Sequence, residues 1–182
     1  MARSGKFGMI VRRFLVPNFV VSVYALLRFR AQVSTRAEVE LSRHLALGPG
    51  TTVSSFAKIK ASHAMLRTGT KCGFATGCFV DAGAVGITMG NHVICGPNVS
   101  IIAVNYRYAR LAVPLEEQGM TSLGIRIGNN VWIGANSVIL DGTELGDNTI
   151  VVAGSVVNRK FPPDCIVQGN PAKLLLRRAA SS

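Results

Sequence analysis

The stretch IGNNVWIGANSVILDGTELGDNTIVVAGSVV, residues 127–157, carries an aliphatic residue at every sixth position. Neither an α-helix, whose period is about 3.6 residues, nor an alternating strand, whose period is about 2, generates such a repeat. A coil with three short sides does, because each side contributes one inward-facing residue. The residues that open the repeats are Ile127, Ile133, Ile139, Leu145, Val151 and Val157.

The residue four places after each opening position is small or β-branched, and glycine often follows the opening residue directly. Such residues permit tight corners. The pattern predicts coils that stack as parallel strands about 4.8 Å apart, so that every side becomes a flat sheet. One coil cannot bury its core face alone, but a stack can. The small or β-branched residues are Val131, Ser137, Thr143, Thr149 and Ser155.

The same frame extends toward the N-terminus, with two slips. We place one extra residue between Ile59 and Leu66, and one missing residue between Cys78 and Met89. The result is roughly six coils of about eighteen residues each. The earlier opening positions are Ile101, Cys95, Met89, Cys78, Cys72, Leu66, Ile59, Val53, Leu47 and, at the start, Leu41.

Composition limits the class of protein. The 182 residues are 48% hydrophobic, which favours one folded domain over disorder. The net charge of +11 suits a phosphorylated ligand or an anionic membrane surface. Nucleic acid is not expected, because the aromatic residues of a base-stacking surface are missing beyond the N-terminal segment. The cysteines form no C-x-x-C pair, which disfavours a zinc site and suits a reducing cytoplasm.

Residues 1–36 form a basic amphipathic segment that we separate from the repeat domain of residues 37–178. Its apolar stretch FLVPNFVVSVYALL, residues 14–27, is too short to span a bilayer and is interrupted by Pro17. With arginines on both sides, it predicts a helix at a membrane interface. The alternative is a helix that packs on the domain or on a neighbouring subunit. A signal peptide is disfavoured, because no convincing cleavage site follows.

The hexads of residues 127–157, together with FPPDCIVQGNPAKLLLRR at 161–178, resemble the hexapeptide-repeat acyltransferases. The nearest branch contains the maltose, galactoside and exopolysaccharide O-acetyltransferases, and the resemblance covers residues 41–178. It implies an all-β, left-handed parallel β-helix with an N-terminal helical segment and a short C-terminal tail. It also implies a homotrimer with active sites between subunits, acetyl-CoA as co-substrate and no metal.

By the same resemblance, the pantetheine arm of the coenzyme would lie along two coils, and a basic group would meet its phosphates. Small residues let a thin chain approach the backbone, and cations suit phosphate. Trp132 has another reading, as a cap of one face or a subunit contact, and the glycines could serve corners only. The implied donor residues are Trp132, Gly134, Ala135, Ala153, Gly154, Arg159, Lys160 and Lys173.

The hexad rhythm fails for about twenty residues between Ile101 and Ile127, which predicts a loop over residues 105–126. Long loops on rigid scaffolds are often functional. The resemblance implies that this loop reaches a neighbouring subunit and closes over the acceptor. Glu116, Glu117 and Gln118 are the candidate contacts to a sugar.

Tyr106 stands where the resembling enzymes carry the histidine that takes a proton from the acceptor hydroxyl. A tyrosine ordinarily has a pKa of about 10 and a histidine of about 6.5, so a phenol is a poor base near neutral pH. We name Asn105, Tyr106 and His92 as catalytic candidates. His92 is too far along its strand to act within the same subunit, but a neighbouring subunit of a trimer could supply it.

The sequence therefore predicts an acyl-CoA-dependent O-acetyltransferase that modifies a sugar hydroxyl in exopolysaccharide or lipopolysaccharide synthesis. We place it in the cytoplasm, peripheral to the inner membrane. The alternative is a catalytically weakened relative that serves as a binding or assembly partner. A zinc enzyme on the same fold is disfavoured, because His44, His63 and His92 lack the spacing of ligands.

Overall fold

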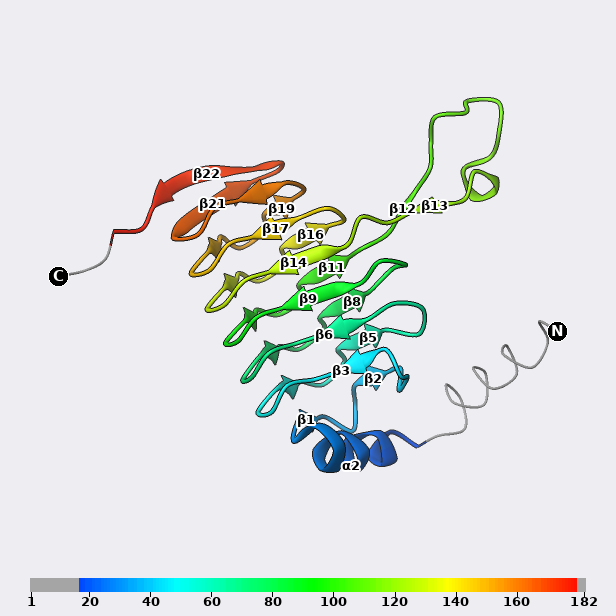
Figure 1. The fold of residues 1–182 in the computed structure, drawn as a ribbon, viewed down its shortest axis with the longest axis vertical. Coiled ribbons are helices and arrows are strands. Elements are labelled where there is room, and N and C mark those ends of the chain that lie inside the picture. The colour runs from blue at the N-terminus through cyan, green and yellow to red at the C-terminus, as the bar shows by residue number, and fades with distance from the viewer. Residues whose placement is uncertain (1–16, 180–182) are drawn as a thin grey trace.

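The structure is a computed structural model that describes residues 17–179 (Figure 1). The expected helix residues 14–16 and four of the N-terminal cations, Arg3, Lys6, Arg12 and Arg13, lie outside the described residues. What is described is one helix followed by a stack of coils with three parallel sheets as its sides. This is the predicted left-handed parallel β-helix.

The first side, sheet A, has eight strands in the order β1-β4-β7-β10-β15-β18-β21-β22. Its pairs are parallel except the last, β21 with β22, which is antiparallel. The expected C-terminal tail is thus an edge strand of this sheet. The bounds are β1 (Gln32–Val33), β4 (Thr52–Val53), β7 (Gly73–Phe74), β10 (Ile94–Cys95), β15 (Trp132–Ile133), β18 (Ile150–Val151), β21 (Cys165–Gly169) and β22 (Ala172–Arg177).

The other two sides are parallel sheets of six strands each. Sheet B consists of β2 (Glu38–Val39), β5 (Lys58–Lys60), β8 (Phe79–Asp81), β11 (Ser100–Ile102), β16 (Val138–Leu140) and β19 (Val156–Val157). Sheet C consists of β3 (Leu45–Ala46), β6 (Leu66–Arg67), β9 (Ile87–Met89), β14 (Ile125–Ile127), β17 (Glu144–Leu145) and β20 (Lys160–Phe161).

Inward residues of the three sheets form one continuous hydrophobic core. All six opening residues of the C-terminal hexads are buried, as the period of six predicts. The N-terminal frame was wrong at four positions. Phe74 and Val80, rather than Cys72 and Cys78, pair in register with Cys95 and Ile101. Leu66 pairs with Ile87 rather than with Met89, and Val39, rather than Leu41, pairs with Ile59. Cys72 and Cys78 are buried two residues before Phe74 and Val80, at the corners. Because a thiol fits a corner as well as a core position, the cysteines led to a wrong assignment of the frame.

The N-terminal coils are also longer than eighteen residues. Twenty-one residues separate Ile59 from its partner Val80, whereas eighteen separate Ile139 from Val157. The difference lies at the corner between sheets B and C, called the loop corner below. There, five residues join β5 to β6 and three join β16 to β17. Longer linkers at one corner leave the sheet registers intact, because only the turn changes.

The helix α2 (Asn18–Phe29) packs on β1 and closes the N-terminal end of the stack (Figure 1). It begins after Pro17, whose fixed φ suits a helix start, and ends at Arg30 in the left-handed conformation. Because β1 is already the first strand of sheet A, the β-helix starts ahead of the boundary expected at residue 37. In residues 17–179, no helix has the length and apolar character needed to cross a membrane.

Candidate active site

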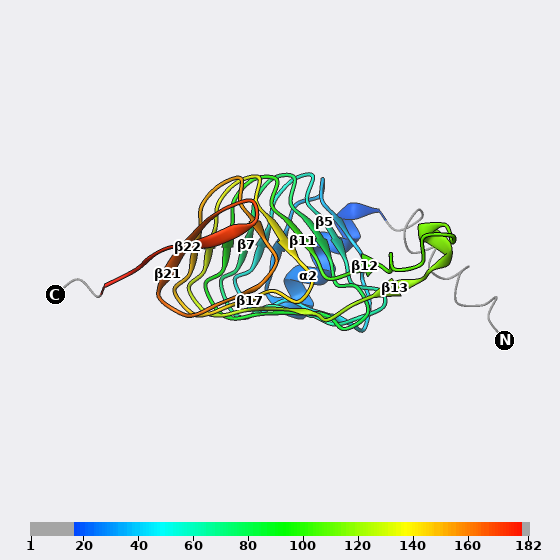
Figure 2. The ribbon, with the colours of Figure 1, turned by 90° about the horizontal axis from the view of Figure 1, so that it is seen from above.

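Tyr106 lies at the foot of the long loop that leaves the loop corner. The two strands of the foot, β12 (Asn105–Tyr106) and β13 (Met120–Thr121), pair antiparallel, with Tyr106 opposite Met120. Figure 2 shows the loop projecting away from the body of the prism. The Tyr106 side chain is 50% exposed. Among the described residues its hydroxyl has no hydrogen-bond partner, and Asn105 is exposed beside it.

The loop is ordered from within by Gln118, whose side chain is buried. Its Oε1 accepts a hydrogen bond from the backbone N–H of Arg110, and its Nε2 donates to the carbonyls of Arg110 and Val113. The amide is therefore occupied by the loop backbone, which corrects its assignment as a sugar contact. Glu116 and Glu117, in the 3-10 turn η1 (Leu115–Glu117), are exposed and remain available.

A second set of contacts fixes the returning end of the loop, and the sequence pattern had not identified it. The buried carboxylate of Asp141 accepts hydrogen bonds from the N–H groups of Leu123 and Gly124, each at 2.8 Å. The hydroxyl of Ser122 donates to the carbonyl of Ala103. An acidic residue in a hexad corner beside the broken rhythm was the available signal. These bonds hold the foot of the loop, and Tyr106 with it, on the rigid prism.

His92 lies at a different corner of the prism, between sheets C and A. It is exposed, adopts a positive φ of 57° and donates its N–H to the carbonyl of Thr70. Lys71 and Asn130 hold the same left-handed conformation in the coils on either side. His92 is thus a corner residue of a regular column. Sheet C separates this corner from the loop corner, so one subunit does not bring His92 to Tyr106.

Trp132 and the small residues of the expected donor site lie together along sheet A and the corner between sheets A and B. Trp132 is 54% exposed, between Ile94 and Ile150 on the outer face. A Cβ on Gly134 would lie 2.5 Å from the backbone nitrogen of Ala153 in the next coil. Ala135 and Gly154 are joined by a backbone hydrogen bond of 2.9 Å. Gly134 is thus packed against the next coil, whereas a Cβ on Gly154 would meet nothing within 4 Å. Ala153 and Gly154 are exposed, and with Ala135 they form a surface of small residues beside the Trp132 indole, called the donor wall below.

The basic donor residues fall into two groups. Lys173 is in β22, at the top of sheet A. Arg159 lies at the loop corner two strands above β11, about 10 Å along the stack from the coil that carries Tyr106. Lys160 is on the outer face of sheet C, where its Nζ is 2.8 Å from the Glu144 carboxylate. One subunit therefore places Arg159 near Tyr106 and the wall of small residues across sheet B from both.

Electrostatics distinguish Glu144 and the core cysteines from the other titratable groups. The hydrogen bond from Lys160 holds the pKa of Glu144 below its ordinary value. Burial raises the pKa of Cys72, Cys78 and Cys95, so these thiols stay protonated near neutral pH. Within the described part of the chain, no three His, Cys, Asp or Glu side chains gather closely enough to hold a metal ion.

Residues 124–159 match the protein family described as bacterial transferase hexapeptide (six repeats). These 36 residues, about a fifth of the chain, carry the hexapeptide repeat of that family. The matched range contains Trp132, the small-residue wall and Arg159. Tyr106 and the long loop precede the matched range, so the family match does not include them.

Several proteins similar in sequence to this chain are named as acetyltransferases. It is 37% identical over 90 residues to the galactoside O-acetyltransferase of Escherichia coli, covering 49% of this chain and 43% of that protein. It is 25% identical over 186 residues to a probable acetyltransferase of Mycobacterium tuberculosis, covering 94% and 62%. The chain therefore spans less than half the length of the E. coli relative and under two thirds of the mycobacterial one.

Solved structures share the fold at low sequence identity. The N-acyltransferase AntD of Bacillus cereus, in complex with dTDP and coenzyme A, superposes with a TM-score of 0.75 at 17% identity, covering 87% of this chain and 89% of AntD. A hexapeptide-repeat acetyltransferase of Vibrio cholerae with acetyl-coenzyme A superposes with a TM-score of 0.59 at 23% identity, covering 96% and 85%.

Proposed function

We propose that this chain transfers an acetyl group from acetyl-CoA to a hydroxyl of a sugar, in the synthesis of a bacterial surface polysaccharide. The observation that carries the proposal is the wall of small residues beside Trp132, on a hexapeptide β-helix that also presents a rigid loop at Tyr106. Such a wall admits a thin pantetheine arm against the backbone. The named acetyltransferases among its relatives support the choice of acetyl.

The complete site requires a second copy of the chain. The donor wall and Tyr106 lie at opposite edges of sheet B, while His92 occupies the third corner. A homotrimer would bring the loop corner of one subunit against sheet A of the next. The exposed apolar side chains on both surfaces support this arrangement, since Ile94 on sheet A is 56% exposed and Leu111 on the loop is 100% exposed.

In the proposed reaction, the acceptor oxygen attacks the thioester carbonyl, a tetrahedral intermediate forms, and the coenzyme leaves as its thiolate. The proton of the acceptor hydroxyl passes to the departing sulfur, directly or through a protein group. Tyr106 can accept a hydrogen bond from the acceptor and orient its oxygen. Arg159 would hold a phosphate of the coenzyme, at the same corner of the prism.

The alternative is a binding or assembly role in a chain that has lost catalysis. The specific observation in its favour is that Tyr106, half-exposed and unpartnered, has no basic neighbour on β12 or β13. The donor wall would persist in such a protein, and coenzyme binding would not lead to transfer.

The test measures acetyl transfer to a panel of sugars and, separately, coenzyme binding, for wild type, Tyr106→Phe, Tyr106→His and His92→Ala. We expect wild type to transfer, and Tyr106→Phe to lose transfer while it binds coenzyme normally. Wild type that binds coenzyme but transfers only after Tyr106→His would favour the alternative. Loss of transfer in His92→Ala alone would assign the proton to a histidine from a neighbouring subunit.

We further propose that α2 docks the protein on an anionic membrane at the cytoplasmic side. Val21 and Ala25 face the prism, and the opposite side of the helix exposes large apolar residues. Exposed Arg28 and Arg30 flank this apolar side, which is the combination that binds anionic lipid interfaces. The exposed apolar residues are Phe19, Val20, Val23, Tyr24, Leu26 and Leu27.

A further inference from the structure

The outer face of sheet C carries one column of charged and polar side chains, one from each strand except β3. Arg67 pairs in register with Thr88, Thr88 with Arg126, and Arg126 with Glu144. Lys160 follows Glu144 on β20, and Ala46 precedes Arg67 on β3. Adjacent members lie about 4.8 Å apart along the column. The charges along it are positive, neutral, positive, negative and positive.

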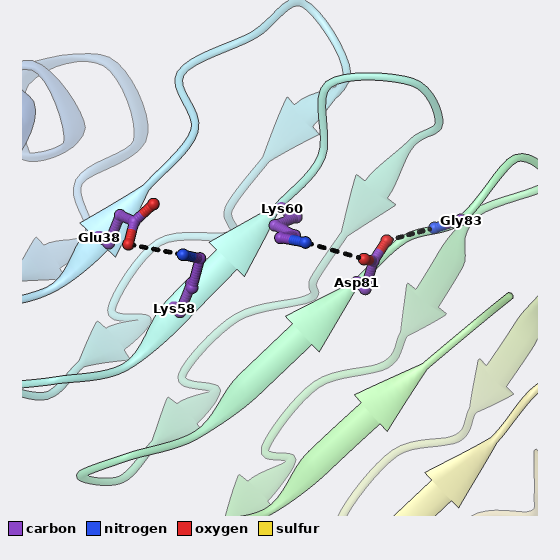
Figure 3. Close-up of polar contacts among 5 residues, drawn as sticks. All are labelled: Glu38, Lys58, Lys60, Asp81 and Gly83. Carbon is purple, nitrogen blue, oxygen red and sulfur yellow. Dashed lines mark hydrogen bonds and ion pairs between the residues drawn. The ribbon is translucent and has the colours of Figure 1, made fainter. Parts of the chain in front are cut away.

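Three cations that face outward from a strand pair with a carboxylate on the adjacent strand. Lys58 is 2.8 Å from Glu38, and Lys60 is 3.5 Å from Asp81, both on sheet B (Figure 3). Lys160 pairs with Glu144 in the same way on sheet C. Among the described residues, the exposed strand cations Arg67, Arg126, Lys173 and Arg177 have no such ion pair.

Arg67 has no carboxylate on either neighbouring strand, because its neighbours are Ala46 and Thr88. In residues 17–179, no ion pair or hydrogen bond engages the guanidinium groups of Arg67 and Arg126 or the hydroxyl of Thr88, and all three side chains are exposed. Arg67 and Arg126 thus flank the Thr88 hydroxyl without hydrogen bonds of their own, although Arg126 also acts electrostatically on the neighbouring Glu144.

A shallow depression of about 440 Å³ opens beside this position. Thr88, Arg126, Glu144 and Lys160 line it. Two carboxylates also line it: Glu144, a member of the column that pairs with Lys160, and Asp147, which accepts hydrogen bonds from Asn129. The end of the depression at Thr88 and Arg126, next to Arg67, therefore carries no carboxylate, whereas Glu144 and Asp147 belong to the next coil.

The geometry points to an anion-binding site over Thr88, in which Arg67 and Arg126 clamp a phosphate or carboxylate group of a ligand. An anion there completes the alternation of charge along the column. Guanidinium groups bind such oxyanions through paired hydrogen bonds, and the threonine hydroxyl supplies a further donor. The site lies on the outer face of sheet C, apart from the donor wall on sheet A.

The anion could belong to the coenzyme or to an anionic acceptor sugar, and both present the same chemistry to the clamp. Binding of the anion itself does not rest on the proposed acetyl transfer. The identity of the ligand does rest on the proposed acetyl transfer. The experiment therefore tests anion binding and ligand identity separately.

The experiment measures the thermal unfolding midpoint as inorganic phosphate is titrated at constant ionic strength, because a ligand that binds only the folded state raises the midpoint. We expect a saturable rise in wild type. The apparent affinity should weaken about tenfold in Arg67→Gln and in Arg126→Gln, since each loses charge-assisted hydrogen bonds. Lys58→Gln, on sheet B, is the matched control and should behave as wild type.

A second variant supplies the anion from the protein itself. Thr88→Glu places a carboxylate between the two arginines, and we expect it to raise the midpoint without phosphate by about 2–4 °C. It should also abolish the phosphate response. Thr52→Glu is the control, because Thr52 is an exposed strand threonine whose neighbours, Gln32 and Gly73, carry no charge. Equal midpoints for the two variants, or an unchanged phosphate response in Arg67→Gln, would overturn the site.

The source of the anion is found with coenzyme A, dephospho-coenzyme A, which lacks the 3′-phosphate, and an anionic sugar phosphate. If Arg67→Gln weakens binding of coenzyme A alone, the clamp holds the 3′-phosphate of the donor. If it weakens binding of the sugar phosphate alone, the clamp belongs to the acceptor. Loss of transfer with all three affinities unchanged would contradict the site and leave the proposed function standing.

Discussion

The side chain of Gln118 bonds to both backbone polar groups of Arg110, accepting from its N–H at 3.0 Å and donating to its carbonyl at 2.8 Å. The Gln118 amide therefore makes the two hydrogen bonds that a paired backbone segment would make with Arg110. The loop over the proposed acceptor position is therefore structured before any partner binds.

We expect Gln118→Ala to loosen the loop without unfolding the prism. The substitution leaves the polar groups of Arg110 and Val113 unpaired, which costs about 1–3 kcal/mol locally. Hydrogen exchange should accelerate over residues 107–119 and stay unchanged in the sheets. Glu117→Ala is the control, since that side chain is exposed. Slow exchange in both variants would contradict the structural role of Gln118.

Asp141→Ala should destabilise the whole protein more than Gln118→Ala does. The buried carboxylate satisfies two backbone N–H groups where the loop rejoins sheet C, and hydrogen bonds to a charged group contribute about 1.5–3 kcal/mol each. Urea unfolding followed by circular dichroism gives the free energy of unfolding. Asp147→Ala, at an exposed corner, is a suitable comparison. A smaller loss for Asp141 than for Asp147 would show that the loop junction does not limit stability.

Removing the Lys160 amine should raise the pKa of Glu144 toward its ordinary value of 4.5. The folded pKa is depressed, so the ion pair contributes above the ordinary pKa and is lost as the pH falls through the folded pKa. Carbon-13 NMR of the Glu144 carboxyl in Lys160→Met measures the shift. Salt should reduce the depression in wild type, because the pair is exposed. An identical titration in both proteins would exclude Lys160 as its cause.

Wild type should sediment with phosphatidylglycerol vesicles and much less with phosphatidylcholine vesicles, if α2 docks on anionic membranes. Val23→Asp with Leu27→Asp places charge on the exposed apolar side of the helix and should abolish this binding. Leu111→Asp is the control, because Leu111 is fully exposed but lies on the distant loop. If the helix variant instead changes the oligomeric mass and leaves vesicle binding intact, the apolar side covers a second copy of the chain.

The period of six was sufficient to predict the fold, because in a three-sided coil each aliphatic opening residue must point into the core. It was less informative in the N-terminal half. There the turn between sheets B and C gains two or three residues per coil, and a cysteine fits a corner as well as a core position. The strand pairing of Phe74 with Cys95 resolves the frame.

The candidate site was predictable where it depends on residue type. Trp132, the small residues and Tyr106 could be chosen from the sequence, whereas the roles of Gln118 and Asp141 could not. Their side chains bond to backbone groups that become neighbours only when the loop folds back on the prism. From sequence alone, polar residues in a loop are expected to be exposed to solvent, because their hydrogen-bond partners are not known.

The sequence by itself determined the β-helix, the position of the loop and the absence of a histidine at residue 106, since each is written in local spacing. Only the tertiary structure decided which residues share a corner. It places Arg159 at the same corner of the prism as the loop of Tyr106, with the donor wall across sheet B, and it aligns Arg67, Thr88 and Arg126 in one column. The physical reason is that stacking joins residues one coil apart, and coil length varies by a few residues that the hexad pattern does not count.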